Sequence, residues 1–107
     1  MVDDQLKKTR QVFHETQDSV TKLKNSLAEF LLQDLATALT FAQLAHDSEK
    51  RGQPEDANRQ RNAAIQAYQA VLRFLPEANP TPSQKTRIEA DLVELESKLR
   101  ILGVSPT

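Results

Sequence analysis

Apolar and polar positions alternate along this chain with the period of an α-helix almost throughout. One predicted helix ends near Arg51, a second runs from about Pro54 to Leu75, and a third from about Pro82 to Leu102. In the third, apolar residues recur at alternating steps of four and three, which places them on one narrow stripe of a charged helix. These residues are Ile88, Leu92, Leu95, Leu99 and Leu102. The pattern predicts an all-α fold, an antiparallel helical bundle with three core helices.

Glycine and proline mark the ends of the first two helices. Gly52 suits the left-handed position that follows a helix, and Pro54 suits the first turn of the next one. Pro76 should stop the second helix near Leu75, because the residue before a proline avoids the helical region. The first two helices are therefore expected to form a hairpin around Gly52.

The third helix carries signals at both ends. Thr81 is expected to cap its start, with Pro82 in the first helical position and Gln84 completing a capping box. At the other end, Gly103 should adopt a left-handed conformation with Val104 folded back on the last turn.

The first helix is expected to be the central one. Between Leu27 and Ala45, apolar residues cover most of its circumference, so it should pack on more than one side. Upstream the stripe narrows to a heptad seam in which Thr9 and Thr16 fill two positions. The apolar members of this N-terminal seam are Val2, Leu6, Phe13, Val20, Leu23 and Leu27.

Asn25 and Ser26 leave two architectures open. Asn25 tolerates a left-handed conformation, and Ser26 with Glu29 matches a capping box, so the chain can turn here and form a four-helix bundle. Against a turn, antiparallel helices need a connection of about 2–5 residues, and almost none are spare. A continuous helix absorbs the four-residue step from Leu27 to Leu31 as a stutter and projects as an arm.

Both architectures divide the chain into an N-terminal amphipathic helix, residues 1–26, and a three-helix core domain, residues 27–107. The core should bury the residues that face the other helices. We expect these to be Leu35, Leu39, Ala42, Ile65, Tyr68, Leu72, Leu92, Leu95 and Leu99.

Charge and composition narrow the function more than they identify it. The chain has 14 basic and 15 acidic residues, so a net charge of −1 gives no electrostatic reason for nucleic acid or an anionic membrane as a partner. There is no cysteine for a disulfide or a thiolate metal site. The N-terminus lacks the apolar core of a signal peptide, and no apolar run reaches the roughly 18 residues of a membrane span. We expect a soluble, cytoplasmic protein.

Candidate chemistry is sparse. His14 with Glu15 and Asp18 places three metal-ligand types near one helical face, but the Glu-x-x-His pairs of di-iron bundles are absent, so a solvated face is expected. His46 with Glu49 is no stronger.

Four basic residues gather around the expected hairpin, at Lys50, Arg51, Arg59 and Arg61. A phosphate or acidic-peptide site is conceivable there. Acidic residues interleave with them, however, and favour a salt-linked hairpin end. No nucleophile motif or glycine-rich phosphate loop occurs.

The segment from Ala63 to Pro76 resembles the second helix of a tetratricopeptide repeat, with Ala64, Tyr68, Val71 and Pro76 at the offsets of that family. Both helices would be about a turn longer than the repeat, and only one unit is present. With the third helix included, residues 28–102 look similar to the three-helix microtubule-interacting and transport domain, which binds amphipathic peptide helices in its grooves. Both resemblances imply a helical hairpin used for protein binding.

These observations predict a non-catalytic module for protein–protein interaction that binds a partner helix or peptide. They suggest no cofactor and no small-molecule substrate. If the first helix is continuous, its seam needs a partner, and Leu6, Phe13, Val20 and Leu23 are the expected contact residues. The alternative is a structural homo-oligomer that assembles through the N-terminal helix.

Overall fold

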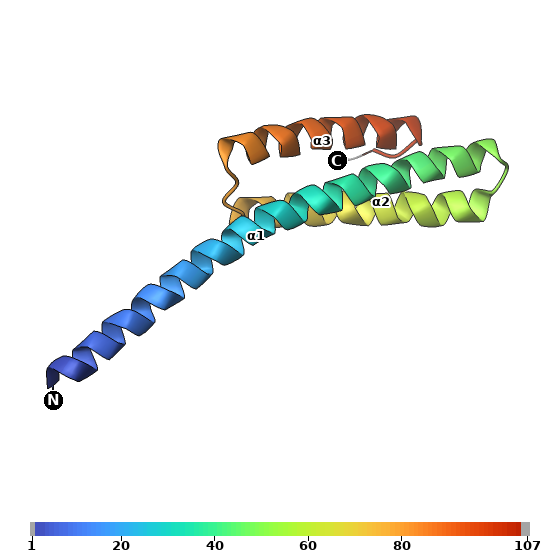
Figure 1. The fold of residues 1–107 in the computed structure, drawn as a ribbon. Coiled ribbons are helices and arrows are strands. Elements are labelled where there is room, and N and C mark those ends of the chain that lie inside the picture. The colour runs from blue at the N-terminus through green and yellow to red at the C-terminus, as the bar shows by residue number, and fades with distance from the viewer. Residues whose placement is uncertain (1, 106–107) are drawn as a thin grey trace.

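The computed structural model describes the backbone of residues 2–105 and the side chains of Leu23 and residues 26–105. This part of the chain is all-α. It contains α1 (Val2–Lys50), α2 (Pro54–Phe74), the short 3-10 helix η1 (Leu75–Glu77) and α3 (Pro82–Ile101). Figure 1 shows the three α-helices packed side by side at one end of a long rod formed by α1.

Helix α1 runs through Asn25 and Ser26 without a turn. The four-helix bundle required a break at this point, and residues 2–105 contain no separate fourth helix. Almost no residues are spare here for a turn between helices, and the capping-box pattern at Ser26 and Glu29 does not require one, since the same pattern occurs inside α3 at Thr86 and Glu89. The expected boundary between residues 26 and 27 therefore lies within a single helix.

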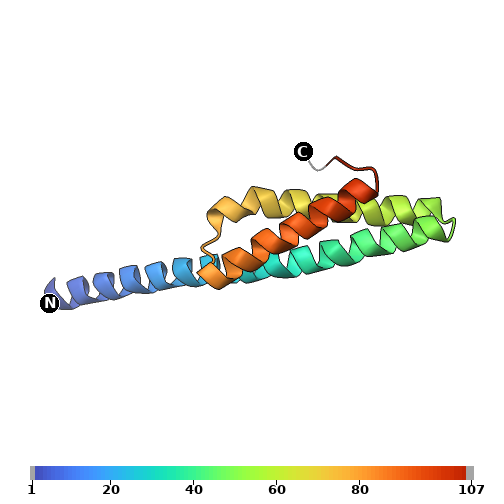
Figure 2. The same cartoon turned by 90° about the horizontal axis from the view of Figure 1, so that it is seen from above.

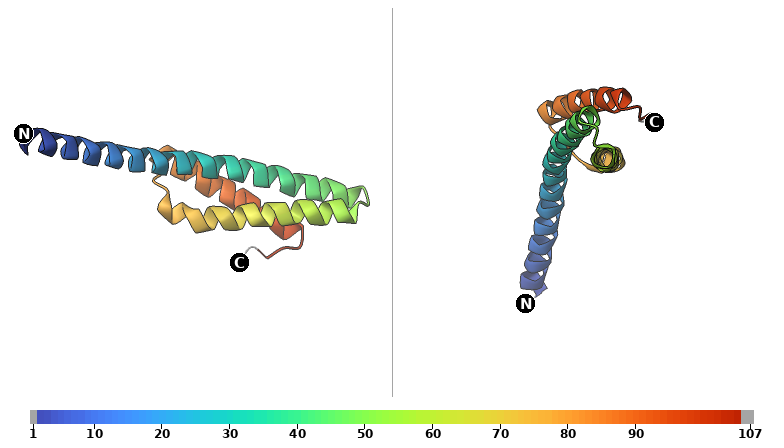
Figure 3. Two further views of the ribbon diagram at one scale, coloured as in Figure 1. Left: turned by 90° about the horizontal axis from the view of Figure 1, so that it is seen from below. Right: turned by 90° about the vertical axis from the view of Figure 1, so that its right-hand side faces the viewer.

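Two helices, α2 and α3, pack on α1. Helix α2 returns antiparallel to α1 after the turn at Gly52, and α3 runs antiparallel to α2 (Figures 1 and 2). Both pack mainly on α1 and touch one another little. The end-on view in Figure 3 shows α2 and α3 on two sides of α1, which confirms that α1 is the central helix.

The N-terminal half of α1 extends beyond the other two helices. At about 1.5 Å per residue, the 49 residues of α1 span about 73 Å, which nearly equals the longest dimension of the molecule, 75 Å. Helices α2 and α3, with 21 and 20 residues, cover less than half of that length. We call the α1 backbone from Val2 to Ser26 the arm; Figures 1 and 2 show it running clear of α2 and α3.

The core consists of leucine and alanine of α1 packed against the apolar stripes of α2 and α3. Of the nine predicted core residues, six are buried, and Leu39 and Ile65 are partly buried against the core. Leu72 was expected inside, but it is 44% exposed, because α3 packs mainly on α1 and makes little contact with α2. The six confirmed residues are Leu35, Ala42, Tyr68, Leu92, Leu95 and Leu99.

The predicted ends of α1 and α2 are confirmed. Gly52 has a φ of 70° and donates to the carbonyl of Glu49 at 3.1 Å, while Gln53 donates to Ser48 at 2.9 Å, the two bonds of a Schellman motif. Pro54 opens α2, and the helix gives way to η1 after Phe74, as expected from Pro76.

The predicted ends of α3 are confirmed as well. Thr81 and Gln84 exchange both hydrogen bonds of a capping box, at 2.9 and 3.2 Å. Gly103 has a φ of 81°, and Val104 donates to the carbonyl of Leu99 at 2.9 Å while packing against the core.

Candidate protein-binding surface

The arm carries the four predicted contact residues. Leu6, Phe13 and Val20 lie on the α1 helix, but their side chains fall outside the described residues. Leu23 is the fourth, and its side chain is 69% exposed. Leu27, the next apolar residue of the seam, is partly buried against the core, so the seam reaches the core at this residue.

Phe30 continues the same seam onto the outside of the core. It follows Leu23 by seven residues and therefore lies on the same side of the helix. The Phe30 side chain is 55% exposed, although Leu31, the next residue, is completely buried. Neighbouring helical residues point about 100° apart, so α1 presents two different stripes here, one toward the core and one toward solvent.

Phe30 belongs to the apolar stretch between Leu27 and Ala45 that was expected to pack on more than one side, and its exposure corrects that expectation for this residue. Among the described side chains, the stripe that α1 buries in the core begins at Ala28, one residue after Leu27, and continues through Leu31 and Leu35. The unbroken seven-residue step from Leu23 was the sequence signal that could have placed Phe30 outside. An apolar band of large side chains thus runs from the exposed flank of the core toward the arm.

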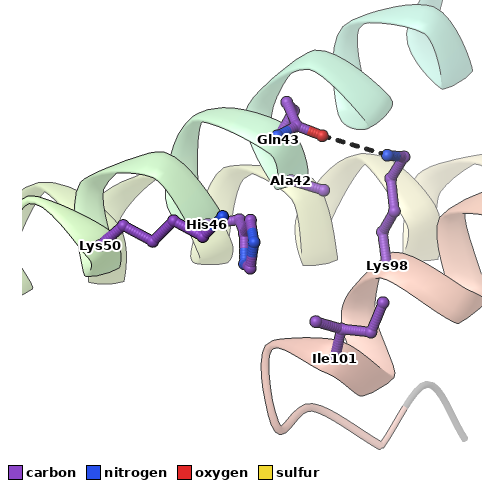
Figure 4. Close-up of a pocket in the computed structure, with 6 residues that line it drawn as sticks. All are labelled: Ala42, Gln43, His46, Lys50, Lys98 and Ile101. Atoms are coloured by element: carbon purple, nitrogen blue, oxygen red, sulfur yellow. Dashed lines mark hydrogen bonds between the residues drawn. The ribbon is translucent and has the colours of Figure 1, made fainter.

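A second surface feature is a hollow of about 270 Å³ between α1 and α3. Figure 4 shows His46 and Lys50 of α1 opposite Lys98 and Ile101 of α3. The Lys98 ammonium donates to Gln43 Oε1 at 3.2 Å, and Gln43 Nε2 donates in turn to Asp47 at 3.2 Å. Gln43 thus accepts a hydrogen bond from Lys98 and donates one to the Asp47 carboxylate.

The sequence offers two sets of metal-ligand side chains, His14 with Glu15 and Asp18, and His46 with Glu49. Among the residues with described side chains, no three histidine, aspartate or glutamate side chains come together as ligands, and this includes His46 and Glu49. His14, Glu15 and Asp18 lie outside the described side chains.

Two of the four basic residues around the hairpin turn form ion pairs with acidic side chains, as expected for a salt-linked hairpin end. Arg59 pairs with Asp56 at 2.6 Å, and Arg61 pairs with Glu49 across the hairpin. Lys50 and Arg51 are exposed.

A further hydrogen bond in this hairpin joins two side chains that the sequence did not single out. Ser48 is 4% exposed and donates to Gln60 Oε1 at 2.7 Å. The Arg61–Glu49 ion pair and the Ser48–Gln60 bond connect α1 to α2, so side chains of the hairpin itself link its two helices at this end.

Tyr68 lies in the core, as expected, and its hydroxyl reaches a polar partner. The Tyr68 hydroxyl donates to Glu96 Oε1 of α3 at 2.8 Å. Burial raises the pKa of Tyr68, the hydrogen bond to Glu96 and the charge of that carboxylate raise it further, and Arg100 opposes the shift. A neutral phenol is the form that this arrangement stabilises, so Tyr68 acts as a link between α2 and α3.

No known protein family, curated protein or solved structure matches this chain. No family match therefore supports the resemblances to tetratricopeptide repeats and to the microtubule-interacting and transport domain. The structure shows a three-helix all-α domain. None of the described helices contains a stretch that is long and apolar enough to cross a lipid bilayer.

Proposed function

We propose that this protein is a non-catalytic interaction module that binds a partner helix along the N-terminal seam of α1, through Leu6, Phe13, Val20 and Leu23. The observation that carries the proposal is the continuity of α1 past the core, with large apolar residues at heptad spacing. Leu23 and Phe30 lie seven residues apart on this seam, and both side chains are more than half exposed.

An arm of this composition is a weak helix when it stands alone. It contains β-branched, serine and aspartate residues, which have lower helix propensity than alanine or leucine. Most helical stability in proteins comes from packing an amphipathic face rather than from propensity. Burying a large apolar side chain contributes about 1.5–3 kcal/mol, so a partner helix on the seam would stabilise the arm.

A second candidate is a structural homo-oligomer that assembles through the same helix. It is favoured by the near-balance of charge on the chain, because two copies with a net charge of −1 repel one another weakly. Both candidates use protein as the partner and need no cofactor, nucleic acid, membrane or small-molecule substrate. A cytoplasmic location stays a prediction of the sequence.

The test uses a helix as the probe. A fluorescently labelled synthetic peptide, helical and amphipathic with leucine at its seam positions, is titrated with the full chain, and anisotropy reports binding. We expect saturable binding that Phe13→Asp abolishes. Gln11→Asp places the same charge on the outer face of the helix and is the matched control. Equal binding by both variants, or none by the wild-type chain, would exclude the seam as the binding surface.

A further inference from the structure

We infer that the partner of the arm is a second copy of this chain, paired antiparallel so that Val2 of one arm faces Leu27 of the other. The inference rests on the proposed function and names the partner of the same surface. It follows from the heptad register, the charges that flank the seam, and the point at which the core begins.

The register is set by the alternating three- and four-residue steps. Counting from Leu6 as position a, the a positions hold Leu6, Phe13, Val20 and Leu27. The d positions hold Val2, Thr9, Thr16, Leu23 and Phe30.

Threonine at two d positions favours an antiparallel pair. In a parallel pair each residue meets its own counterpart, so Thr9 would face Thr9 and Thr16 would face Thr16 across the seam. An antiparallel pair sets a against d, and each threonine then faces Val20 or Phe13 of the second copy. Every layer then contains at least one large apolar side chain, and the remaining layers pair Val2 with Leu27 and Leu6 with Leu23.

The flanking e positions select this register among the antiparallel ones. They hold Asp3, Arg10, Gln17 and Lys24. With Val2 opposite Leu27, Asp3 lies across from Lys24 of the second copy, twice by symmetry, and Arg10 lies across from Gln17. Sliding the pair by one heptad would set Arg10 against Lys24, two like charges. In a parallel pair the e positions face g residues, which are uncharged, so charge would not favour one register over another.

The extent of the overlap agrees with the position of the core. The pair would end at Leu27, and Ala28 is the first residue of α1 with a described side chain that is fully buried within the molecule. Six large apolar side chains from each copy, at roughly 60–120 Å² of apolar surface each, would bury about 700–1,400 Å². This approaches or reaches the size of a specific interface. The two cores would then lie at opposite ends of the paired arms.

The first experiment is a molar-mass measurement by light scattering over a range of concentrations. The wild-type chain should be a dimer. Phe13→Asp should give a monomer that keeps the helical signal of its core, whereas Gln11→Asp should remain a dimer. Phe30→Asp separates the registers: Phe30 lies beyond the overlap proposed here, so this variant should remain a dimer. It is part of the seam in a parallel pair or in a pair slid by one heptad, and loss of the dimer would overturn the register.

The second experiment reports orientation, using the absence of native cysteine. Gln5→Cys and Ser26→Cys chains, which differ in mass, are mixed and treated with a short bifunctional thiol reagent. The antiparallel pair brings these two g positions together, so the mixed dimer should dominate the mass spectrum. Crosslinks of each variant with itself would indicate a parallel pair and overturn the proposed orientation, while leaving the seam as a binding surface.

A charge exchange gives a test that does not depend on crosslinking. Asp3→Lys and Lys24→Asp should each weaken the dimer by about tenfold in Kd, because each creates two like-charge pairs. The double variant should restore the wild-type Kd only if residues 3 and 24 face one another. A wild-type chain that is monomeric throughout would overturn self-pairing, and the peptide titration would then decide the proposed function by itself.

Discussion

The two halves of α1 belong to one helix, yet they use their surface differently. From Ala28 to Ala45 the helix buries two leucines and four alanines, and the small alanine side chains let α2 and α3 approach the same helix on two sides. From Val2 to Leu23 every apolar residue except Val12 lies on one narrow seam, with threonine in two of the seam positions. The two halves thus differ in the width of the apolar stripe rather than in helix propensity. A wide stripe packs against two helices at once, whereas a narrow seam can pack against one.

The largest expected effect comes from making one substitution in both halves. Leu35→Ala removes a completely buried side chain and should lower the free energy of unfolding by about 2–5 kcal/mol through lost transfer energy and the cavity left behind. Leu23→Ala removes the same atoms from an exposed side chain. It should change the stability of the core by less than about 0.5 kcal/mol. Urea denaturation of the two variants measures both values, and similar losses would remove the distinction between the halves.

Breaking the helix between the halves is the next test. Asn25→Pro removes a backbone hydrogen bond and clashes with the preceding turn, which costs about 3 kcal/mol or more inside a helix. Because Asn25 lies before the buried stripe, the loss should fall on the arm and on self-association. Far-UV circular dichroism should show fewer helical residues, while the thermal midpoint of the core stays close to wild type. A large fall in that midpoint would mean that the core depends on the arm.

A substitution at the end of the core that is remote from the arm tests whether self-association is independent of core stability. Gly103 closes α3 with a φ of 81°, so Gly103→Ala should destabilise the core by about 1 kcal/mol although no neighbouring atom obstructs the new methyl group. Molar mass should be unchanged, because this cap is remote from the seam. Gly103→Asn is the matched control, since asparagine tolerates the left-handed region better and should lose less.

The smallest effect concerns Tyr68 and appears with pH. The folded protein raises the pKa of this phenol, so the associated stability is present below the unfolded pKa of about 10 and is lost as pH rises toward the higher folded value. Tyr68→Phe should remove this contribution and cost about 0.5–1.5 kcal/mol at neutral pH through the lost bond to Glu96. Denaturant midpoints measured between neutral and alkaline pH should fall less steeply in Tyr68→Phe than in wild type.

Local signals made the ends of the helices predictable. Gly52, Pro76 and Gly103 act through backbone conformation alone, so their effect does not depend on the rest of the fold. The choice at Asn25 could not be made in the same way, because a capping-box pattern also occurs inside helices. The structure resolves it through a helix that carries on to form the core.

Phe30 and Leu72 show why the packing was harder to predict than the helices. Periodicity places a residue on a face, but it does not say where the neighbouring helix sits. Leu72 lies on the apolar face of α2, yet it is exposed because α3 packs on α1 instead of closing against α2. Phe30 lies outside because it follows the seven-residue spacing of the seam from Leu23, whereas the buried stripe of α1 runs through the next residue, Leu31. The contact role of Leu6, Phe13, Val20 and Leu23 stays a prediction that the exposed Leu23 motivates.

The sparse contact between α2 and α3 has a consequence for how the molecule opens. Helix α3 is attached mainly to one neighbour, and the bond from Tyr68 to Glu96 is the described side-chain hydrogen bond that joins it to α2. Local opening follows contiguous units with few contacts. Helix α3 should therefore detach as a unit at a lower free energy than global unfolding, and its amide protons should exchange with solvent before those of the α1–α2 hairpin.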